Sequence, residues 1–300
     1  MDILPKMEKE EYFLLKSIFD ETRGLKRAFR AWVFLWFLWY VLLRVILRLL
    51  IGKARRQYVQ DLLGLHYSRG FNVVYGDLLG LLYEPHVRRI IKQCLKDGGV
   101  FIDVGAYVGV FSEYAYRLIR KKTGLVVAVE PDPDNYSVLR ALIPEEVKLV
   151  NAAIWIENGF VKLRKGAPRH IRRYPFSKKV SDSSTLVPQP FHEERGLLSN
   201  EFIDVRSIRL DTLIRQLNLT QVDLIKMDIE GAELYILTDP NLDLTLVKAM
   251  IIEVHYPFAS PQSKAIASSL RGKSFQLYPI FGLDKLRYHL YAVKTNKSQQ

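Results

Sequence analysis

Cysteine is almost absent from this 300-residue chain, and this shortage limits what the protein can be. The one cysteine, Cys94, excludes an internal disulfide framework and any metal site built from several cysteines. The opening residues are acidic and lack the basic-then-apolar order of a secretory signal, so we expect no such signal. Hydrophobic residue types nevertheless make up 49% of the chain, which is enough for a large core and is not typical of a disordered protein.

Acidic residues are absent from one long stretch of the chain. Between residues 22 and 56 there are nine Lys or Arg and no Asp or Glu, and a second basic run covers residues 164–179. Because the chain has a net charge of +12, these runs favour phosphate groups on a lipid, a nucleic acid or an anionic substrate, unless they form only a solvated surface. The second run has little aromatic interleaving (Tyr174 and Phe176), which argues against nucleic acid.

The acid-free stretch contains a long apolar run. Residues 31–43 are apolar without interruption, and the run continues to Ile51 with only Arg44 and Arg48 as breaks. A helix over residues 31–51 would be about 31 Å long, close to the hydrocarbon thickness of a bilayer. We therefore expect a membrane-inserted helix within an N-terminal helical region of residues 1–58. The alternative is packing against the rest of the chain or a second protomer, so a homo-oligomer stays open.

Residues 59–300 form the second predicted domain, in which short apolar runs alternate with helical patterns. Strands are expected at 100–104, 125–130, 147–154, 222–227, 248–254, 275–280 and 286–293. Helices are expected at 111–120, at 136–142, from about 232, and at 263–271. This alternation predicts an α/β fold with a mostly parallel sheet covered by helices on both faces. A basic insertion at 157–209 interrupts the pattern and predicts a hairpin and loop above the sheet, near substrate entry.

The turn after the first of these strands lacks the G-x-G-x-x-G pattern of dinucleotide-binding folds. Its glycines, Gly105 and Gly109, have the spacing G-x-x-x-G and follow Asp103 at the strand end. Glycine lets the backbone approach a ligand, and the amides of a helix start face that ligand. Asp103 would repel a diphosphate but suits an amine or another positive centre. By itself the turn also fits a simple strand–helix connection.

Glu130 ends the next expected strand, and Pro131 breaks the strand after it. An acidic residue at this position can accept hydrogen bonds from both ribose hydroxyls of a nucleoside. Taken with Asp103 and the glycine turn, Glu130 predicts a nucleoside that carries a cation and no phosphate. S-adenosylmethionine is such a molecule, so we expect it as the cofactor.

Three carboxylates, Asp228, Glu230 and Glu233, crowd the end of the strand expected at 222–227. If that strand neighbours the one ending at Asp103, their loops share one crevice, because ligands bind where the strand order reverses. Asp228 would then lie near the sulfonium and the methyl acceptor. Glu230 and Glu233 also fit a helix start, where carboxylates favour the helix dipole.

The following strand adds Glu253 and His255, which alternate to the same side of the sheet. His255 is a candidate catalytic base or acceptor contact, although a lone histidine is more often structural. Lys226 is expected to pair with one of the nearby carboxylates and keep it ionised. Asp228 and Glu230 offer oxygen ligands for a divalent cation, but the reaction requires no metal and we predict none.

These segments resemble the FkbM family of S-adenosylmethionine-dependent methyltransferases. The resemblance rests on FIDVGAYVG, VVAVEPDPDNYSVLRA, SSTL, VDLIKMDIEGAELYIL and IIEVH, and it covers about residues 83–293. It implies a Rossmann-like class I methyltransferase fold with a seven-stranded sheet, and methyl transfer, often to oxygen. With neighbouring turn residues included, the predicted cofactor-binding residues are Glu84, Asp103, Gly105, Ala106, Gly109, Glu130, Pro131, Asn151, Ala152 and Asp228. The active-site acids that it implies are Asp228 and Glu230, beside His255.

The expected function is O-methylation of a hydroxyl on a glycan or lipid-linked acceptor at the membrane. S-adenosylmethionine is an intracellular metabolite, so we expect the catalytic domain of this membrane-associated protein to face the cytoplasm. Two alternatives stay open at this point. One is a nicotinamide-dependent oxidoreductase, against which the glycine spacing argues, and the other is a membrane-tethered nucleotide-binding protein without catalysis.

Overall fold

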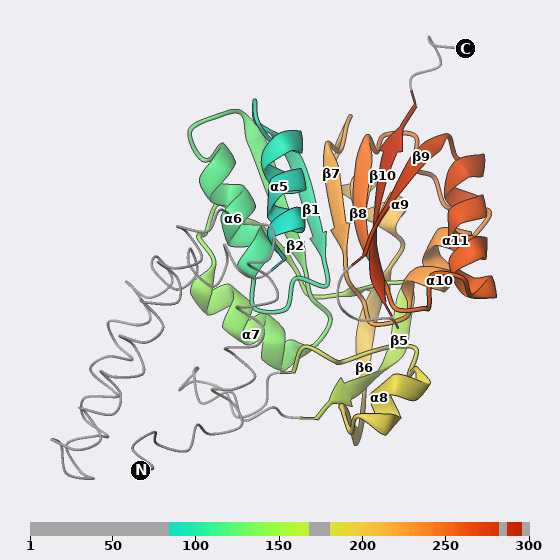
Figure 1. The fold of residues 1–300 in the computed structure, drawn as a ribbon. Helices are drawn as coiled ribbons and strands as arrows, with labels where there is room; N and C mark the ends of the chain where they lie inside the picture. The colour runs from blue at the N-terminus through green and yellow to red at the C-terminus, as the bar shows by residue number, and fades with distance from the viewer. Residues whose placement is uncertain (1–83, 168–180, 282–286, 296–300) are drawn as a thin grey trace, which may run out of the picture. The chain divides into compact units, whose positions relative to one another are not determined.

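The computed structural model describes residues 84–167, 181–281 and 287–295 (Figure 1). The chain divides into two compact units, residues 1–86 and residues 87–300. The helix predicted at 31–51 and the boundary predicted between residues 58 and 59 lie outside the described residues and stay predictions. Among the residues that the structure describes, no helix has both the length and the apolar character needed to cross a bilayer.

A seven-stranded sheet in the order β3-β2-β1-β7-β8-β10-β9 forms the centre of the second unit. Its strands are β1 (Gly99–Val104), β2 (Gly124–Val129), β3 (Lys148–Val150), β7 (Leu224–Met227), β8 (Ala249–Val254), β9 (Phe275–Ile280) and β10 (Tyr288–Lys294). The strands from β3 to β8 pair in parallel, whereas β10 is antiparallel to both of its neighbours. The prediction of a mostly parallel, seven-stranded sheet is therefore confirmed.

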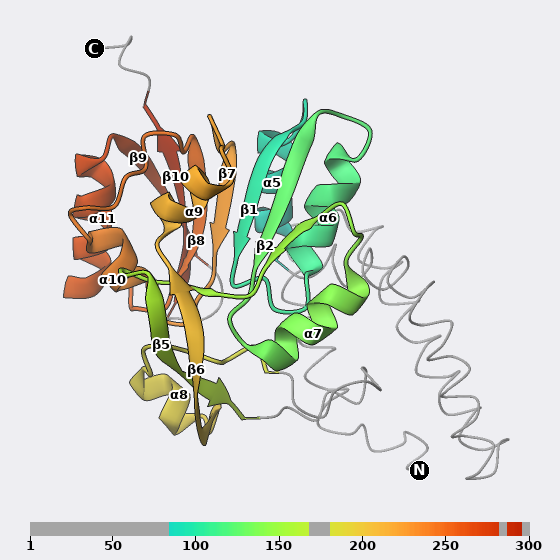
Figure 2. The ribbon, with the colours of Figure 1, turned by 180° about the vertical axis from the view of Figure 1, so that it is seen from behind.

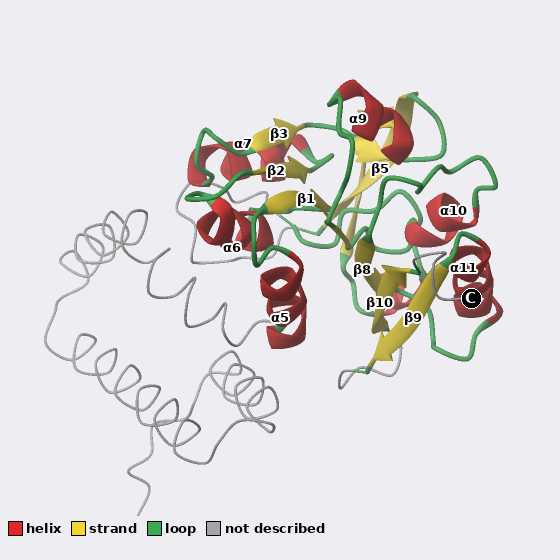
Figure 3. Cartoon of the chain, turned by 90° about the horizontal axis from the view of Figure 1, so that it is seen from above, coloured by secondary structure: helices red, strands yellow, loops and turns green. Residues whose placement is uncertain are grey.

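Helices cover both faces of this sheet, as its buried strands require (Figure 3). One core lies under α5 (Pro85–Cys94, from Val87 onward), α6 (Val110–Ile119) and α7 (Pro133–Leu142). The other core lies under α9 (Leu210–Gln216), α10 (Glu233–Thr238) and α11 (Pro261–Gly272). The start of α7 follows from its sequence, because the side chain of Asp132 accepts a hydrogen bond from the Asp134 amide and Pro133 follows the cap.

The predicted insertion forms a second, smaller sheet. Its strands are β4 (Ala153–Ile154), β5 (Gly159–Gly166) and β6 (Leu198–Ile208), in the order β4-β6-β5, with β5 and β6 antiparallel. Together with the short helix α8 (Pro190–Glu194), β5 and β6 lie beyond the carboxyl ends of the main strands (Figures 1 and 2). The pairing of β5 with β6 is antiparallel, whereas the single strand predicted at 147–154 is two strands, β3 and β4, which belong to different sheets.

The strand order reverses between β1 and β7. The chain runs from β1 outward through β2 and β3, and it returns to pair β7 with the other edge of β1. In this pairing Asp103 lies opposite Lys226. The carboxyl ends of the two strands therefore share one crevice, as the sequence predicts, and this is the position where open α/β sheets bind their ligands.

Candidate active site

Asp103, near the carboxyl end of β1, is a completely buried acidic group of the crevice. Its side chain is buried, and its Oδ2 accepts a hydrogen bond of 2.6 Å from the Ser112 hydroxyl. Its Oδ1 accepts no hydrogen bond within the described residues and lies 3.6 Å from Lys226 Nζ. Burial raises the pKa of Asp103, and the charge of Lys226 together with the Ser112 hydrogen bond offsets only part of this rise. A buried carboxylate oxygen without a hydrogen bond is suited to a cationic ligand.

The glycine turn keeps the backbone open beside Asp103. Gly105 has a φ of 77°, and a Cβ there would lie 1.8 Å from the carbonyl oxygen of Asp228. Gly109 has a φ of 91° and closely approaches the side chains of Leu139 and Ile143. Both positions therefore need glycine, the first because two loops of the crevice touch there. The turn and the open oxygen of Asp103 fit the amine-bearing part of S-adenosylmethionine.

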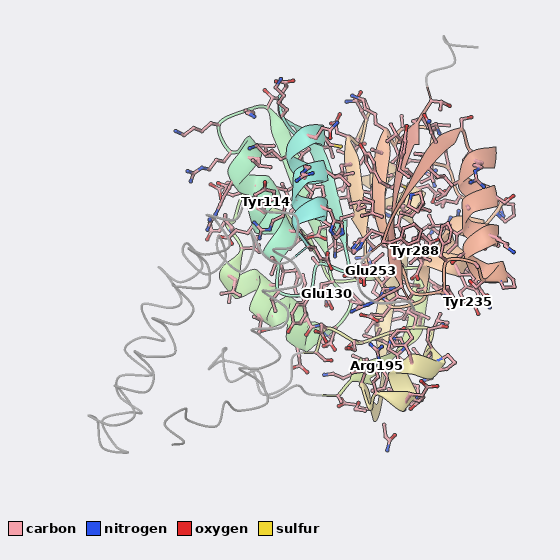
Figure 4. All side chains as sticks on the ribbon, viewed as in Figure 1. Tyr114, Glu130, Arg195, Tyr235, Glu253 and Tyr288 are labelled. Carbon is pink, nitrogen blue, oxygen red and sulfur yellow. The ribbon has the colours of Figure 1, made fainter. Side chains whose placement is uncertain are left out.

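Glu130 is buried and lies just beyond the carboxyl end of β2 (Figure 4). Its Oε2 accepts a hydrogen bond of 2.9 Å from the Tyr107 amide. Its Oε1 accepts hydrogen bonds from the Asp132 amide at 3.0 Å and from Asn135 Nδ2 at 3.1 Å. Because a carboxylate has about four acceptor positions, these donors leave room for about one more. The predicted contact of Glu130 with the ribose stays a prediction.

Asn151, Ala106 and Ala152 of the predicted cofactor site lie at the ends of the first three strands. Asn151 Nδ2 donates to the carbonyl oxygens of Glu130 and Pro131, at 2.8 and 3.2 Å, and so ties the ends of β2 and β3 together. Ala106 follows Gly105, and its amide donates to Val129. Ala152 is buried beside Asn151. Glu84 precedes α5 and belongs to the first compact unit, so its role stays a prediction.

Glu130 gives a testable dependence of stability on pH. Burial raises its pKa from 4.5 to about 8, although its three N–H donors lower it. The folded state therefore binds more protons than the unfolded state between these values, and its stability falls as the pH rises through them. The shift corresponds to at most about 5 kcal/mol. We expect the unfolding free energy of Glu130→Gln, relative to wild type, to rise by a few kcal/mol between about pH 5 and pH 8.5.

Urea denaturation of both proteins across this range measures the difference. The variant loses one hydrogen-bond acceptor for the Tyr107 amide, so it is less stable at low pH, but this loss does not depend on pH. A difference that stays constant across the range would show that the carboxyl group has an ordinary pKa in the folded protein.

The acidic loop after β7 begins beside Lys226. Lys226 Nζ lies 3.3 Å from Asp228 Oδ2 and 3.3 Å from the carbonyl oxygen of Gly105, which it contacts as a donor. Lysine therefore pairs with a nearby carboxylate, as the sequence predicts. Burial raises the pKa of Asp228, but the charges of Lys226, His255 and His289 outweigh burial and lower it overall. Asp228 is thus held as a carboxylate at the mouth of the crevice.

Glu230 lies beside His192 and His255, and nothing in the sequence singles out His192. His192 of α8 is fully buried, and its Nδ1 accepts a hydrogen bond of 2.9 Å from the Gln189 amide. Its Nε2 therefore carries the proton and donates to Glu230 Oε2 at 2.9 Å. No local spacing reveals this pair, because the two residues are brought together only by folding of the insertion. Glu230 and the next residue, Gly231, both have a positive φ, of 53° and 106°.

Glu233 begins α10, as expected of a helix-start carboxylate, but it is completely buried. Its Oε2 accepts a hydrogen bond of 2.9 Å from the Gly231 amide, and its Oε1 accepts one of 2.6 Å from the His255 amide. It therefore joins the loop after β7 to the end of β8. Burial lowers the pKa of His255, but the charges of Glu230, Glu233 and Glu253 outweigh burial and raise it well above its usual value.

Residues 181–186, which include the SSTL segment, connect the two halves of the site. Ser181 and Asn135 exchange two hydrogen bonds, of 2.8 and 3.1 Å, at the start of α7. The hydroxyl of Ser184 donates to Asp132, and that of Thr185 donates to the carbonyl oxygen of Glu230 at 2.7 Å. The insertion thus fixes the loops after β2 and β7 relative to each other.

A family model and a related sequence that match this chain are those of methyltransferases. The model of the methyltransferase FkbM domain matches residues 103–277, more than half of the chain. Methyltransferase sdnD of Sordaria araneosa is 27% identical over 213 residues, which are 61% of this chain and 76% of that protein. A solved FkbM methyltransferase from Methylobacillus flagellatus is 15% identical and has a TM-score of 0.37, over 65% of this chain and 44% of that one. Fibrillarin from Aeropyrum pernix, solved with bound S-adenosylmethionine, is 14% identical with a TM-score of 0.37, over 66% and 67% of the two chains.

Proposed function

Because the chain belongs to the FkbM family of methyltransferases and its cofactor is S-adenosylmethionine, we propose that it methylates a hydroxyl oxygen of a glycan or lipid-linked acceptor at a membrane. Membership of this family decides against the two alternatives that the sequence left open, the nicotinamide-dependent oxidoreductase and the binding protein without catalysis. The nature of the acceptor is the new part of the proposal.

S-adenosylmethionine supplies a methyl group on a positively charged sulfur, which an acceptor oxygen attacks in line. This transfer neutralises charge, so positioning contributes most of the rate. Asp103 and the turn at Gly105 hold the cationic amino-acid part of the cofactor. The acceptor hydroxyl must also lose its proton, and a nearby carboxylate accepts it.

One observation favours Asp228 over Glu230 as that carboxylate. The side chain of Asp228 is 22% exposed, and Lys226 engages its Oδ2. The side chain of Glu230 is 14% exposed, and its Oε2 lies within 2.9 Å of His192 and 3.4 Å of His255. Asp228 is therefore the more accessible and the less engaged of the two. We assign the acceptor-facing role to Asp228 and a positioning role to Glu230.

The membrane location rests on the sequence before residue 84. The apolar stretch at 31–51 has the length of a bilayer core and is flanked by basic residues at both ends. An acceptor held in the same membrane would be presented to the crevice at high effective concentration. A lipid-linked glycan is held in the membrane in this way, whereas the effective concentration of a freely diffusing metabolite is not raised.

Transfer of labelled methyl groups tests the proposal. The full chain is incubated with methyl-labelled S-adenosylmethionine and with either total membranes or the soluble fraction of cells from the source organism. We expect label to enter the lipid extract of the membranes and to survive as a methyl ether on the isolated glycan. Asp103→Ala serves as the control and should abolish both cofactor binding and labelling.

Two results would contradict the proposal. Label that enters only soluble metabolites, with none in the lipid extract, would remove the membrane acceptor but leave the methyltransferase activity intact. Label that is released by mild base, as from a methyl ester, would replace the hydroxyl acceptor with a carboxylate.

A further inference from the structure

Glu253 has no part in the proposed methyl transfer, yet its buried side chain lies among the groups of the active site. It is near the carboxyl end of β8, at the same end of the sheet as Glu130 (Figure 4). Its Oε1 is 3.8 Å from His255 Nε2. The same imidazole nitrogen lies 3.8 Å from Asp228 Oδ1 and 3.4 Å from Glu230 Oε2. Three carboxylates therefore converge on one ring nitrogen.

His255 itself points to a ligand. Its side chain is completely buried, and its Nε2 makes no hydrogen bond within the described residues. A buried imidazole nitrogen without a hydrogen bond is rare, because loss of hydration is not compensated. On the other side of the ring, Nδ1 lies 3.3 Å from Glu233 Oε1 and also makes no hydrogen bond within the described residues. A carboxylate beside one ring nitrogen is typical of histidines that bind a metal through the other.

The spacing of the three side chains suits one ion. One ligand atom each from Asp228, Glu253 and His255 lies within 4.8 Å of the others. Two ligands of one ion, each about 2.1 Å from it, are at most roughly 4.2 Å apart, so the contacts of 3.8 Å at His255 Nε2 fit with small side-chain movements. Two carboxylates and an imidazole favour a transition-metal ion over Mg²⁺ or Ca²⁺, which prefer oxygen ligands alone.

We propose that Asp228, Glu253 and His255 form a binding site for a divalent transition-metal ion such as Mn²⁺. The site goes beyond the proposed function, because it does not depend on which acceptor is methylated. It also differs from the Asp228–Glu230 pair that the sequence suggested, since Glu230 is engaged by His192. The bound ion would lie at the crevice mouth, where a Lewis acid can hold an acceptor oxygen.

Lys226 and Arg287 contact the cluster within the described residues, and His289 Nε2 lies 4.0 Å from the other carboxylate oxygen of Glu253, Oε2. Lys226 approaches Asp228 at Oδ2, which leaves Oδ1 for the side of His255. Arg287 Nη1 lies 2.9 Å from Glu253 Oε1, but the arginine side chain is 42% exposed. Because the arginine end of this pair is solvated, the guanidinium can move into solvent when a divalent ion binds Glu253. An ammonium group would be attracted to the carboxylates, but it cannot bind an imidazole nitrogen, whereas a divalent ion can displace the Nε2 proton of His255 and take its place.

Calorimetric titration of the chelator-treated full chain with Mn²⁺ tests the site. We expect one saturable site that binds Mn²⁺ more tightly than Mg²⁺. Glu253→Gln and His255→Gln should each weaken Mn²⁺ at least tenfold. Asp204→Asn is the matched control, since this carboxylate is 65% exposed on β6 and should leave the affinity unchanged. Circular dichroism shows whether each variant is folded.

Co²⁺ gives a second measurement that needs no variant. Ligation by an imidazole and carboxylates should produce visible absorption bands when Co²⁺ is added to the wild-type chain, and excess Mn²⁺ should remove them. The proposal is overturned if the wild-type chain shows no saturable Mn²⁺ binding, or if folded Glu253→Gln and His255→Gln bind Mn²⁺ as wild type does. Either result is independent of methyl transfer, so it leaves the proposed function to its own test.

Discussion

Replacing Asp228 by asparagine is expected to lower kcat for methyl transfer by about 100-fold or more, which is the typical contribution of a positioned proton acceptor. Asparagine has nearly the same shape, and its amide oxygen can still face Lys226 Nζ, which lies 3.3 Å from Asp228 Oδ2. The loop after β7 should therefore keep its geometry. The contacts proposed between the cofactor and Asp103 and Gly105 are unchanged in this variant, so the Kd for S-adenosylmethionine should change by no more than a few-fold.

Steady-state kinetics with a purified acceptor and calorimetry with the cofactor measure the two quantities separately. Asp97→Asn is the control, because Asp97 is exposed and precedes β1. It therefore lies at the amino ends of the strands, away from the crevice at their carboxyl ends. If Asp228→Asn keeps a kcat within threefold of wild type, Asp228 does not accept the proton. Glu230→Gln in the same assay then shows whether the role belongs to Glu230.

The sheet and the cofactor half of the site follow from local sequence. Strands β1, β2, β7 and β8 are short apolar runs that end in glycine, proline or charged residues, and a parallel sheet buried on both faces needs such runs. Asp103 and Gly105 lie within three residues of each other. Their geometry is set by one strand–helix turn, so the sequence alone could indicate it.

The acceptor half of the site could be predicted only in part. Asp228 and Glu230 stand out as charges at a strand end, but His192 reaches Glu230 from the insertion, at a separation of 38 residues. Glu233 is at a helix start, as its position suggests, yet its carboxylate is buried and accepts hydrogen bonds from two amides. Contacts of this kind depend on how the second sheet packs on the first, and no residue spacing encodes them.

Helix α9 is not among the helices predicted from the sequence, and its shortness is the physical reason. Helix α9 has seven residues, Leu210–Gln216, and follows directly on the long strand β6. Two turns carry too few apolar positions for a clear helical period, and isolated helices of this length are unstable. Burial of Leu210, Leu213 and Ile214 against the sheet stabilises it instead.

The second large effect is expected from Gly105→Ala, which should destabilise the protein by about 2–5 kcal/mol. An alanine with a φ of 77° costs roughly 1–2 kcal/mol in backbone strain. Its Cβ would also lie 1.8 Å from the carbonyl oxygen of Asp228, so β1 and β7 must separate at their carboxyl ends, which adds about 1–3 kcal/mol. For a domain of this size the melting temperature should fall by roughly 10 °C.

Gly196→Ala separates the strain from the steric contact. Gly196 also has a positive φ, of 60°, but a Cβ there meets nothing within 4 Å. It should therefore cost only the backbone strain of about 1–2 kcal/mol and leave the Kd for S-adenosylmethionine unchanged. Thermal unfolding and calorimetry on the two variants provide the comparison. If Gly105→Ala is no less stable than Gly196→Ala and binds the cofactor as wild type does, the loops after β1 and β7 are not in contact, and the shared crevice on which the Asp228 assignment rests does not exist.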